Sequence, residues 1–256
     1  MKAIIRILLF VLVVALLFQC EKESPEVIIP DDNFLNALIE LGVDTNGDGI
    51  ISHAEAEAIT SLYVSKDSIA DMTGIEAFIN LDTLNCSNNQ IYSLNVVNNT
   101  TLRFFHCGGN RLTSLDVTNN ISLIYLYCGG TMSGGDNQLT NLDVSKNTTL
   151  EYLLCGRNQL TSLDISNCID LIMLNVWRNH LSSLDVSNNT KLKNLTCAET
   201  WLTSLDISKN TALEYINLHL MSWLHEVCVW TMPFPPAGVE MNTYLSPGIY
   251  FTTDCN

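Results

Sequence analysis

The chain has 256 residues and carries 27 acidic against 12 basic side chains, which gives a net charge of −15 at pH 7. A nucleic-acid-binding surface needs a basic footprint for the phosphates, so this charge argues against a nucleic-acid partner. A strongly acidic surface also keeps an exported protein soluble.

The N-terminus has the features of an export signal. Lys2 and Arg6 precede an uncharged, apolar run over residues 7–18. That run is shorter than the ~20 residues that a membrane-spanning helix needs. We therefore expect a secretory signal over residues 1–19.

The signal ends at a cysteine in a context typical of lipid attachment. The segment Leu17-Phe18-Gln19-Cys20 resembles the lipobox of bacterial lipoproteins, which implies a lipid on Cys20. Residues 20–30 read as a tether, and their acidic start over residues 21–26 resembles the export signals of Bacteroidota surface lipoproteins. The resemblance implies an exported outer-membrane lipoprotein at the cell surface, held to the membrane only through its lipid. The alternative is ordinary secretion with Cys20 as a thiol.

A calcium-loop pattern follows the tether. Residues 44–55 match D-x-[DN]-x-[DN]-G-x5-E at every constrained position. The spacing brings oxygen atoms, the ligands that Ca²⁺ prefers, around one loop. The expected ligands are the side chains of Asp44, Asn46 and Asp48, the carbonyl of Ile50, Ser52 at the position of a bridging water, and the carboxylate of Glu55.

The flanks of this loop predict two helices. Phe34, Ala37, Leu38 and Leu41 share one helical face, while Ser52 and Glu55 form a capping box for a helix through Ala58. Residues 31–58 thus resemble an EF-hand helix-loop-helix that covers the N-terminal end of the fold. Because there is no second loop, we expect a structural ion rather than a switch. The alternative is a turn that never holds metal.

A phrase close to L-x-x-L-x-C-x-x-N-x-L-T-S-L-D-V-S-x-N-T-x recurs every 21 residues. Its copies begin at Leu81, Leu102, Leu123, Leu150, Leu171, Leu192 and Leu213, and the single longer spacing reflects six inserted residues, 131–136. Such a period predicts a solenoid, in which each copy buries its apolar face only against its neighbours. With an atypical first copy, about eight repeats span residues 59–220.

The phrase resembles the short bacterial form of the leucine-rich repeat. The resemblance implies an α/β-type repeat solenoid that is mostly β, curved, with a parallel sheet on its concave side and helix-poor segments on its convex side. From the alternation of side chains, Leu at positions 1 and 4 and Cys at position 6 point inward. Asn at position 9 is expected to bond to the backbone of the turn.

The cysteines divide into two groups. Position 6 carries Cys86, Cys107, Cys128, Cys155 and Cys197, in a column shared with Val and Leu, which predicts packing rather than a metal or redox ladder. Cys228 and Cys255 flank two strand-like runs in residues 221–256, which we interpret as a small β C-terminal cap. In an oxidising compartment we expect these two to form a disulfide.

Repeat positions 3, 5 and 7 are expected to face the concave surface. There the sequence places an aromatic patch of Phe104, His106, Tyr125, Tyr127, Tyr152 and Trp177. Exposed aromatic clusters mark interaction sites, although aromatic residues also suit strands in general. On the opposite face Asp116, Asp143, Asp164, Asp185 and Asp206 recur in register; we expect bonds from Ser, Thr or backbone N–H groups, with a cation ladder as the alternative.

No catalytic or phosphate-binding motif is present, so we expect a binding module and not an enzyme. The preferred function is recognition of a protein partner by the concave face of a monomer stabilised by Ca²⁺. The alternative is a glycan-binding module that uses Tyr125, Tyr127, Tyr152 and Trp177 as stacking platforms. A third hypothesis is a spacer without a ligand.

Overall fold

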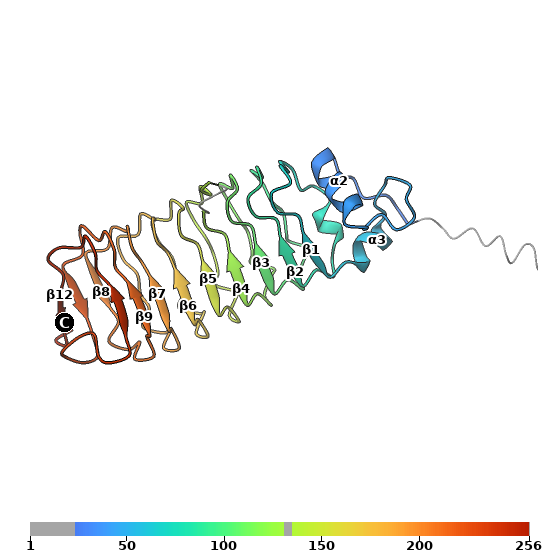
Figure 1. The fold of residues 1–256 in the computed structure, drawn as a ribbon. Helices are drawn as coiled ribbons and strands as arrows, with labels where there is room; N and C mark the ends of the chain where they lie inside the picture. The colour runs from blue at the N-terminus through green and yellow to red at the C-terminus, as the bar shows by residue number, and fades with distance from the viewer. Residues whose placement is uncertain (1–23, 131–134, 256) are drawn as a thin grey trace, which may run out of the picture.

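The computed structural model describes residues 24–130 and 135–255, which form one elongated solenoid (Figure 1). Turns of the chain stack side by side, from the helices at the N-terminal end to short strands at the C-terminal end. No helix within the described residues is long and apolar enough to cross a membrane. The expected signal sequence and Cys20 lie outside the described residues.

A parallel sheet of nine strands runs the length of the solenoid, in the order β1-β2-β3-β4-β5-β6-β7-β9-β11. Each strand has three residues; in eight of the nine strands the middle one is buried while its two neighbours are at least partly exposed, as the alternation predicts. The strands are β1 Ser61–Tyr63, β2 Thr83–Asn85, β3 Phe104–His106, β4 Tyr125–Tyr127, β5 Tyr152–Leu154, β6 Met173–Asn175, β7 Asn194–Thr196, β9 Tyr215–Asn217 and β11 Glu240–Asn242.

The repeat period sets the register of this sheet. Phe104 pairs with Tyr125, and Tyr125 pairs with Tyr152, so equivalent repeat positions lie side by side. The second pairing spans the six-residue insertion in the sequence, so the insertion does not shift the register of the sheet. A slip of one residue would turn the buried middle residues outward, which is why the burial pattern fixes this register.

Behind the strands lies a continuous core of leucine rows and the position-6 column. Cys86, Cys107, Cys128, Cys155 and Cys197 are fully buried and share this column with Val64, Val176 and Leu218, so the packing interpretation is confirmed. Burial raises the pKa of Cys86, Cys155 and Cys197 to about 12. The thiols are therefore uncharged and act as small apolar side chains.

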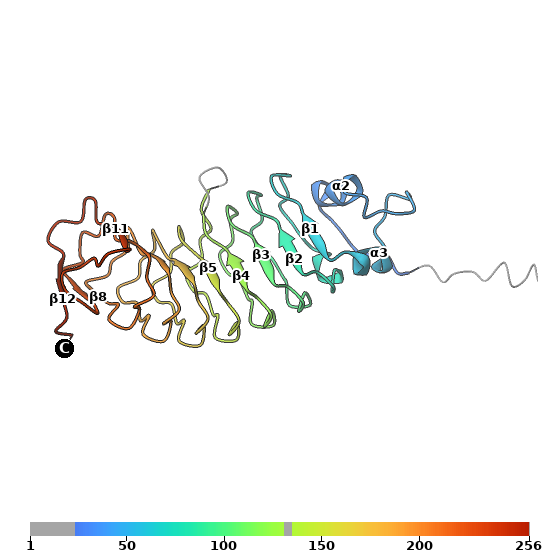
Figure 2. The same ribbon diagram turned by 60° about the horizontal axis from the view of Figure 1, so that its bottom comes forward.

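A second, shorter sheet lies at the C-terminal end, in the order β12-β10-β8 (Figure 2). It comprises β8 Ser204–Asp206, β10 Glu226–Cys228 and β12 Tyr250–Thr252. Cys228 in β10 is joined to Cys255, with 5.6 Å between their Cα atoms. The region expected to be a separate cap also supplies β11 to the long sheet, so it continues the solenoid by a further turn.

Two helices cover the N-terminal end: α2 Asp32–Glu40 and α3 His53–Ala58, with a 3-10 turn η1 at Ile75–Ala77. The expected apolar face of α2 is buried at Phe34, Ala37 and Leu38. Leu41 differs, because it lies beyond the end of the helix and is 52% exposed. The capping box of Ser52 and Glu55 is present, and Ile51 packs into the core.

Asp31 ties this helical cap to the first turn of the solenoid. One carboxylate oxygen accepts from the N–H of Phe34 at 3.0 Å, while the other accepts from Ala70 at 2.9 Å and Asp71 at 3.0 Å. Burial by itself would raise the pKa of Asp31, but the bonds from Ala70, Phe34 and Asp71 outweigh it and lower the pKa below 3.8.

Buried asparagines satisfy the backbone at the turns. In a first ladder, each side-chain amide group donates to carbonyls of its own and the preceding turn, and each amide oxygen accepts a backbone N–H. Asn158, for example, donates to Cys128 and Cys155 and accepts from the N–H of Leu139 at 3.0 Å. This ladder consists of Asn89, Asn110, Asn137, Asn158 and Asn179, which confirms the expectation for position 9.

A second asparagine ladder lies in the opposite turns of the repeat and uses only its donors. Asn147 donates to Val117 at 3.0 Å and Asn120 at 2.8 Å, but its amide oxygen has no protein partner. Cys168 takes one rung, with its sulfur 3.6 Å from the Val144 carbonyl oxygen and 3.7 Å from that of Asn147. The thiol is a weak donor and has no acceptor oxygen, but it is tolerated because no backbone N–H group needs an acceptor at this position. The asparagines of this ladder are Asn99, Asn120, Asn147, Asn189 and Asn210.

The two ladders predict unequal costs for the same substitution. Asn158→Ala leaves the N–H of Leu139 without a partner, while the carbonyls of Cys128 and Cys155 keep bonds from Asn137 and Asn179. Asn147→Ala leaves no group unpaired, because the carbonyls of Val117 and Asn120 keep bonds from backbone N–H groups and an unpaired oxygen is removed. Because an unsatisfied buried donor costs about 1–3 kcal/mol, Asn158→Ala should lower the free energy of unfolding by that much more than Asn147→Ala. Urea unfolding of both variants measures the difference, and equal losses would contradict this account.

The hydrogen bonds of Asp31 predict that the attachment of the helical cap to the solenoid weakens in acid. Because its pKa is lowered in the folded state, its stabilisation is present above pH 3.8 and is lost as the pH falls through the folded value. Asp31→Ala should cost about 1–2 kcal/mol at pH 7 and clearly less at pH 3. The exposed neighbour Asp32→Ala is the matched control for the change in charge. Thermal unfolding at both pH values tests this; an equal cost of Asp31→Ala at both would refute it.

Candidate functional site

The aromatic residues expected on the sheet face lie on adjacent strands. Phe104 and Tyr125 are paired residues of β3 and β4, and Tyr125 in turn pairs with Tyr152 of β5. The rings of Tyr125 and Tyr152 are 6.1 Å apart. The guanidinium of Arg103 lies 5.4 Å from the Phe104 ring, which is 39% exposed. These rings present a continuous surface that is only partly covered by the protein.

His106 and Tyr127 form a stacked pair beside them. Their ring centroids are 4.3 Å apart and the planes differ by 8°. The hydroxyl of Tyr127 donates to the carbonyl of Gly130 at 3.0 Å. Burial lowers the pKa of His106 and raises that of Tyr127. Both side chains are therefore neutral at pH 7, and this part of the face offers flat rings rather than charge.

Glycines at repeat position 7 make room for these rings. A Cβ at Gly108 would lie 3.2 Å from the Tyr127 ring and 2.7 Å from the carbonyl oxygen of Gly129. A Cβ at Gly156 would collide with the ring of Trp177. Gly156 is thus a steric requirement of Trp177, whereas Gly108 is required first by the close backbone of the next turn and then by the Tyr127 ring.

Trp177 lies apart from the other members of the expected patch. It follows β6 by two residues and leans over Gly156 at the end of the strands. The guanidinium groups of Arg157 and Arg178 lie 5.3 Å and 5.9 Å from its ring centroid. Trp177 therefore belongs to the edge of the solenoid, where two arginines surround it.

An apolar hollow of about 440 Å³ opens on the sheet face at β1 to β4. Its exposed walls are Tyr63, Thr83, Asn85, Phe104, His106 and Tyr125. Tyr63, which is 59% exposed, is a member that the sequence analysis did not select. It occupies position 5 of the atypical first repeat, so the same alternation that identified Tyr127 could have found it.

The expected calcium loop has the right kinds of donor atom, but its carboxylates, those of Asp44, Asp48 and Glu55, do not form a cluster within 4.8 Å. The carboxylate of Asp44 accepts from the N–H groups of Gly47 at 2.7 Å and Gly49 at 2.9 Å, and that of Asp48 accepts from Ile50. Asn46 bonds to Asp48. The oxygen donors fit Ca²⁺, and Gly47 and Gly49 adopt the left-handed conformation that such a tight loop needs.

Glu55 is turned to other partners. One of its oxygens accepts from the N–H and hydroxyl of Thr45, both at 2.8 Å, and the other accepts from Ser52. These bonds, led by that from the N–H of Ser52, lower the pKa of Glu55 to about 2. Within the described ranges, the one cluster of three potential ligands closer than 4.8 Å is Asp206 with Cys228 and Cys255, whose sulfurs are bonded to each other.

The aspartate column on the opposite face is satisfied by local bonds. Asp143, Asp164 and Asp185 each accept from the N–H of the serine two residues later, at 2.8–2.9 Å. These bonds lower the pKa of each carboxyl, while the neighbouring aspartate opposes the shift for Asp164 and Asp185. Asp116 and Asp206 accept from Thr118 and Ser208 in the same way. The expectation of hydrogen-bonded aspartates is confirmed.

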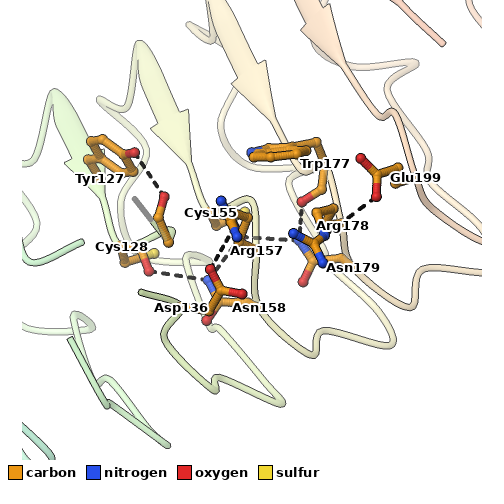
Figure 3. A network of polar contacts seen from close by, with 11 residues as sticks. Tyr127, Cys128, Asp136, Cys155, Arg157, Asn158, Trp177, Arg178, Asn179 and Glu199 are labelled. Atoms are coloured by element: carbon orange, nitrogen blue, oxygen red, sulfur yellow. Dashed lines mark hydrogen bonds and ion pairs between the residues drawn. The ribbon is translucent and has the colours of Figure 1, made fainter. Parts of the chain in front are cut away.

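A polar groove along the edge of the solenoid was not predicted. It measures about 280 Å³ and is formed by consecutive turns (Figure 3). Arg157 pairs with Asp136, and Arg178 lies 3.4 Å from Glu199. His180 is stacked on Trp201 with 4.3 Å between ring centroids. A signal is present in the sequence, since Arg157 and Arg178 occupy the same repeat position, but this position lies outside the strand, where the alternation of side chains gives no prediction.

Comparison with known proteins supports the fold. No family model matches the chain. A stretch of 71 residues is 39% identical to Internalin J of Listeria monocytogenes, and this stretch is 28% of the present chain and 8% of Internalin J. The solved functional domain of that internalin, which includes a cysteine ladder, matches with a TM-score of 0.51 and 26% identity over 89% of this chain and 63% of the domain.

Two further solved structures share the architecture. Internalin C2 of Listeria monocytogenes matches with a TM-score of 0.55 and 21% identity, over 77% of this chain and 98% of its own. A leucine-rich-repeat protein of Leptospira interrogans matches with a TM-score of 0.57 and 24% identity, over 66% of this chain and 46% of its own. The fold is therefore a leucine-rich-repeat solenoid of the kind found in internalins, although the chain spans only a part of Internalin J.

Proposed function

We propose that this protein is a surface-exposed binding module that recognises a protein partner through the long sheet. The observation that carries this proposal is the apolar hollow of about 440 Å³ beside Phe104 and Tyr125, continued by the rings of His106, Tyr127 and Tyr152. Rigid aromatic side chains around a pocket are the usual anchors of protein interfaces, because they bury a large area at a small cost in conformational entropy.

The charge of the chain specifies the partner further. A net charge of −15 favours a partner whose apolar contact is framed by basic residues, since complementary potentials speed association and exclude acidic competitors. The likeness to leucine-rich-repeat internalins supports a binding role. Attachment to the outer membrane through a lipid on Cys20 belongs to the same proposal and rests on the sequence at residues 17–20.

A structural Ca²⁺ ion in the loop of residues 44–55 is a second part of the proposal. Asp44, Asn46, Asp48 and the Ile50 carbonyl would hold it, with Glu55 joining after release from Thr45. The ion would supply positive charge to a loop of carboxylates and brace the helical cap, whose exit helix α3 leads directly into β1. Covering a terminal repeat in this way prevents fraying of the solenoid.

The sheet-face proposal predicts a position-specific cross-link. A photoreactive residue at Phe104 should capture a partner from host or envelope protein, whereas the same residue at Tyr92, 61% exposed and outside the hollow, should not. Phe104→Ser with Tyr125→Ser should then weaken binding of the purified partner by about a hundredfold, as for two interface anchors of about 1–2 kcal/mol each. Equal capture from both positions, or undiminished binding by the double variant, would move the interface elsewhere.

The calcium proposal predicts a metal-dependent melting temperature. Millimolar Ca²⁺ should bind with a dissociation constant of about 10⁻⁴–10⁻³ M and raise the melting temperature, with Mg²⁺ doing less. Asp44→Asn changes the first position of the motif, where only Asp fits, and keeps one oxygen for the N–H of Gly47. It should abolish the calcium-dependent part of the shift, measured against the metal-free melting temperature of the same variant. Calorimetry that detects no uptake of Ca²⁺ would reduce the loop to a structural turn.

A further inference from the structure

The edge groove has two parallel rows of side chains that extend over four consecutive turns. The first row, at the turn positions, contains Asp136, Arg157, Arg178 and Glu199 (Figure 3). The second row contains Gln138, Gln159, His180 and Trp201. Between them, the amides of Asn137, Asn158 and Asn179 are consumed by bonds to the backbone, so the floor is rigid. The two rows are therefore held at a fixed separation.

The charges in the first row are paired within the protein. Arg157 is bound to Asp136, and Arg178 faces Glu199. The row as a whole is neutral, and an anionic or cationic ligand would have to break one of these pairs. The row still offers carboxylate oxygens and guanidinium N–H groups at its surface, since the side chains of Asp136 and Arg178 are 43% and 45% exposed. Such a surface suits a ligand that is neutral and carries many donors and acceptors.

The second row adds flat amides and an aromatic platform. Gln138 and Gln159 are exposed, and each amide can donate and accept at once. His180 covers Trp201 on one side, yet the Trp201 side chain remains 52% exposed. An indole held from one side by a neighbour is a preorganised stacking surface. On the sheet face, by contrast, the hollow is lined mainly by aromatic and aliphatic side chains.

The spacing of the turns matches a linear chain of sugars. Parallel strands lie about 4.8 Å apart, so one step from turn to turn is close to the length of one pyranose with its glycosidic link. Each step would present a hydroxyl-bearing ring to one residue of each row. An exposed indole can stack on the uncharged face of a sugar ring. Planar amide, carboxylate and guanidinium groups can bind its vicinal hydroxyls.

The backbone does not require the charged side chains of this groove. Arg157, Arg178 and Glu199 adopt φ values of +56°, +51° and +53°, and the same repeat position carries Asn88, Gly109 and Leu220 in other turns, also with positive φ. Left-handed geometry favours glycine, so a charged side chain at this position carries a conformational cost.

We propose that the edge groove between Arg157 and Trp201 binds a neutral oligosaccharide of about three residues, separately from the protein-binding sheet face. Binding is expected to be stacking on the face of Trp201 that His180 leaves open, at the end of the groove, with hydrogen bonding to Gln159, Arg178 and Glu199 along the groove. The proposal is independent of the proposed function, because the groove and the hollow share no lining residue.

An array of neutral oligosaccharides, with trigalacturonate as an acidic probe, tests this with the full mature protein. At least one neutral trisaccharide should bind on the array, and calorimetry then measures its affinity for the protein in solution. Trp201→Ala should weaken it about tenfold or more, as for loss of a stacking platform, and Gln159→Ala should weaken it by a smaller factor. Unchanged thermal unfolding of both variants confirms that the fold is intact.

Two matched variants locate the site. Trp223→Ala removes an equally exposed indole, 61% exposed and outside the groove, and should leave sugar binding unchanged. Tyr125→Ala, on the sheet face, should also leave sugar binding unchanged. A failure of the sugar-binding proposal can therefore be told apart from a failure of the proposed protein binding at the sheet face. The proposal is overturned if no neutral sugar binds at millimolar concentration, if only trigalacturonate binds, or if Trp201→Ala binds like the wild type.

Discussion

The stack of turns depends on side-chain amides that replace the backbone bonds a turn cannot make for itself. Each strand has only three residues, so most of each 21-residue repeat lies outside the sheet, where buried N–H and C=O groups need other partners. The two asparagine ladders supply them at both bends of the coil. Their contributions differ: the first ladder serves donors and acceptors, and the second serves acceptors alone, which explains why a cysteine at position 168 is accommodated only in the second.

Because these inward bonds fix the coil, the outward positions are free to carry binding chemistry. On the strands, the outward positions carry the rings around the hollow, and Gly156 makes room for Trp177 at the end of the strands. At the edge of the solenoid, the outward positions carry the two rows of groove side chains between Asp136 and Trp201. The same scaffold thus presents an apolar face and a polar groove that meet at Trp177, whose ring lies near both Arg157 and Arg178.

The sequence predicted what the repeat period controls. Register, inward cysteines, outward aromatics and the position-9 asparagines follow from a period of 21 and a strand alternation of two. It did not predict features that depend on side-chain competition or on the ends of the array. Besides the expected capping box with Ser52, Glu55 accepts two bonds from Thr45, and Leu41 lies past the helix end. Beyond residue 220 the phrase is lost, so β11 could not be recognised, although the chain still adds a strand to the long sheet.

Hydrogen exchange at the N–H groups that donate to the first ladder tests the role of the asparagines most directly. The N–H groups of Leu112, Leu139 and Leu160 lie in turns, and each donates to a side-chain oxygen and not to another backbone group. The account predicts that they exchange only on global unfolding, with the same free energy as the buried strand residue Leu153. Exchange at the rate of exposed turn amides would show that the ladders form contacts without holding the coil together.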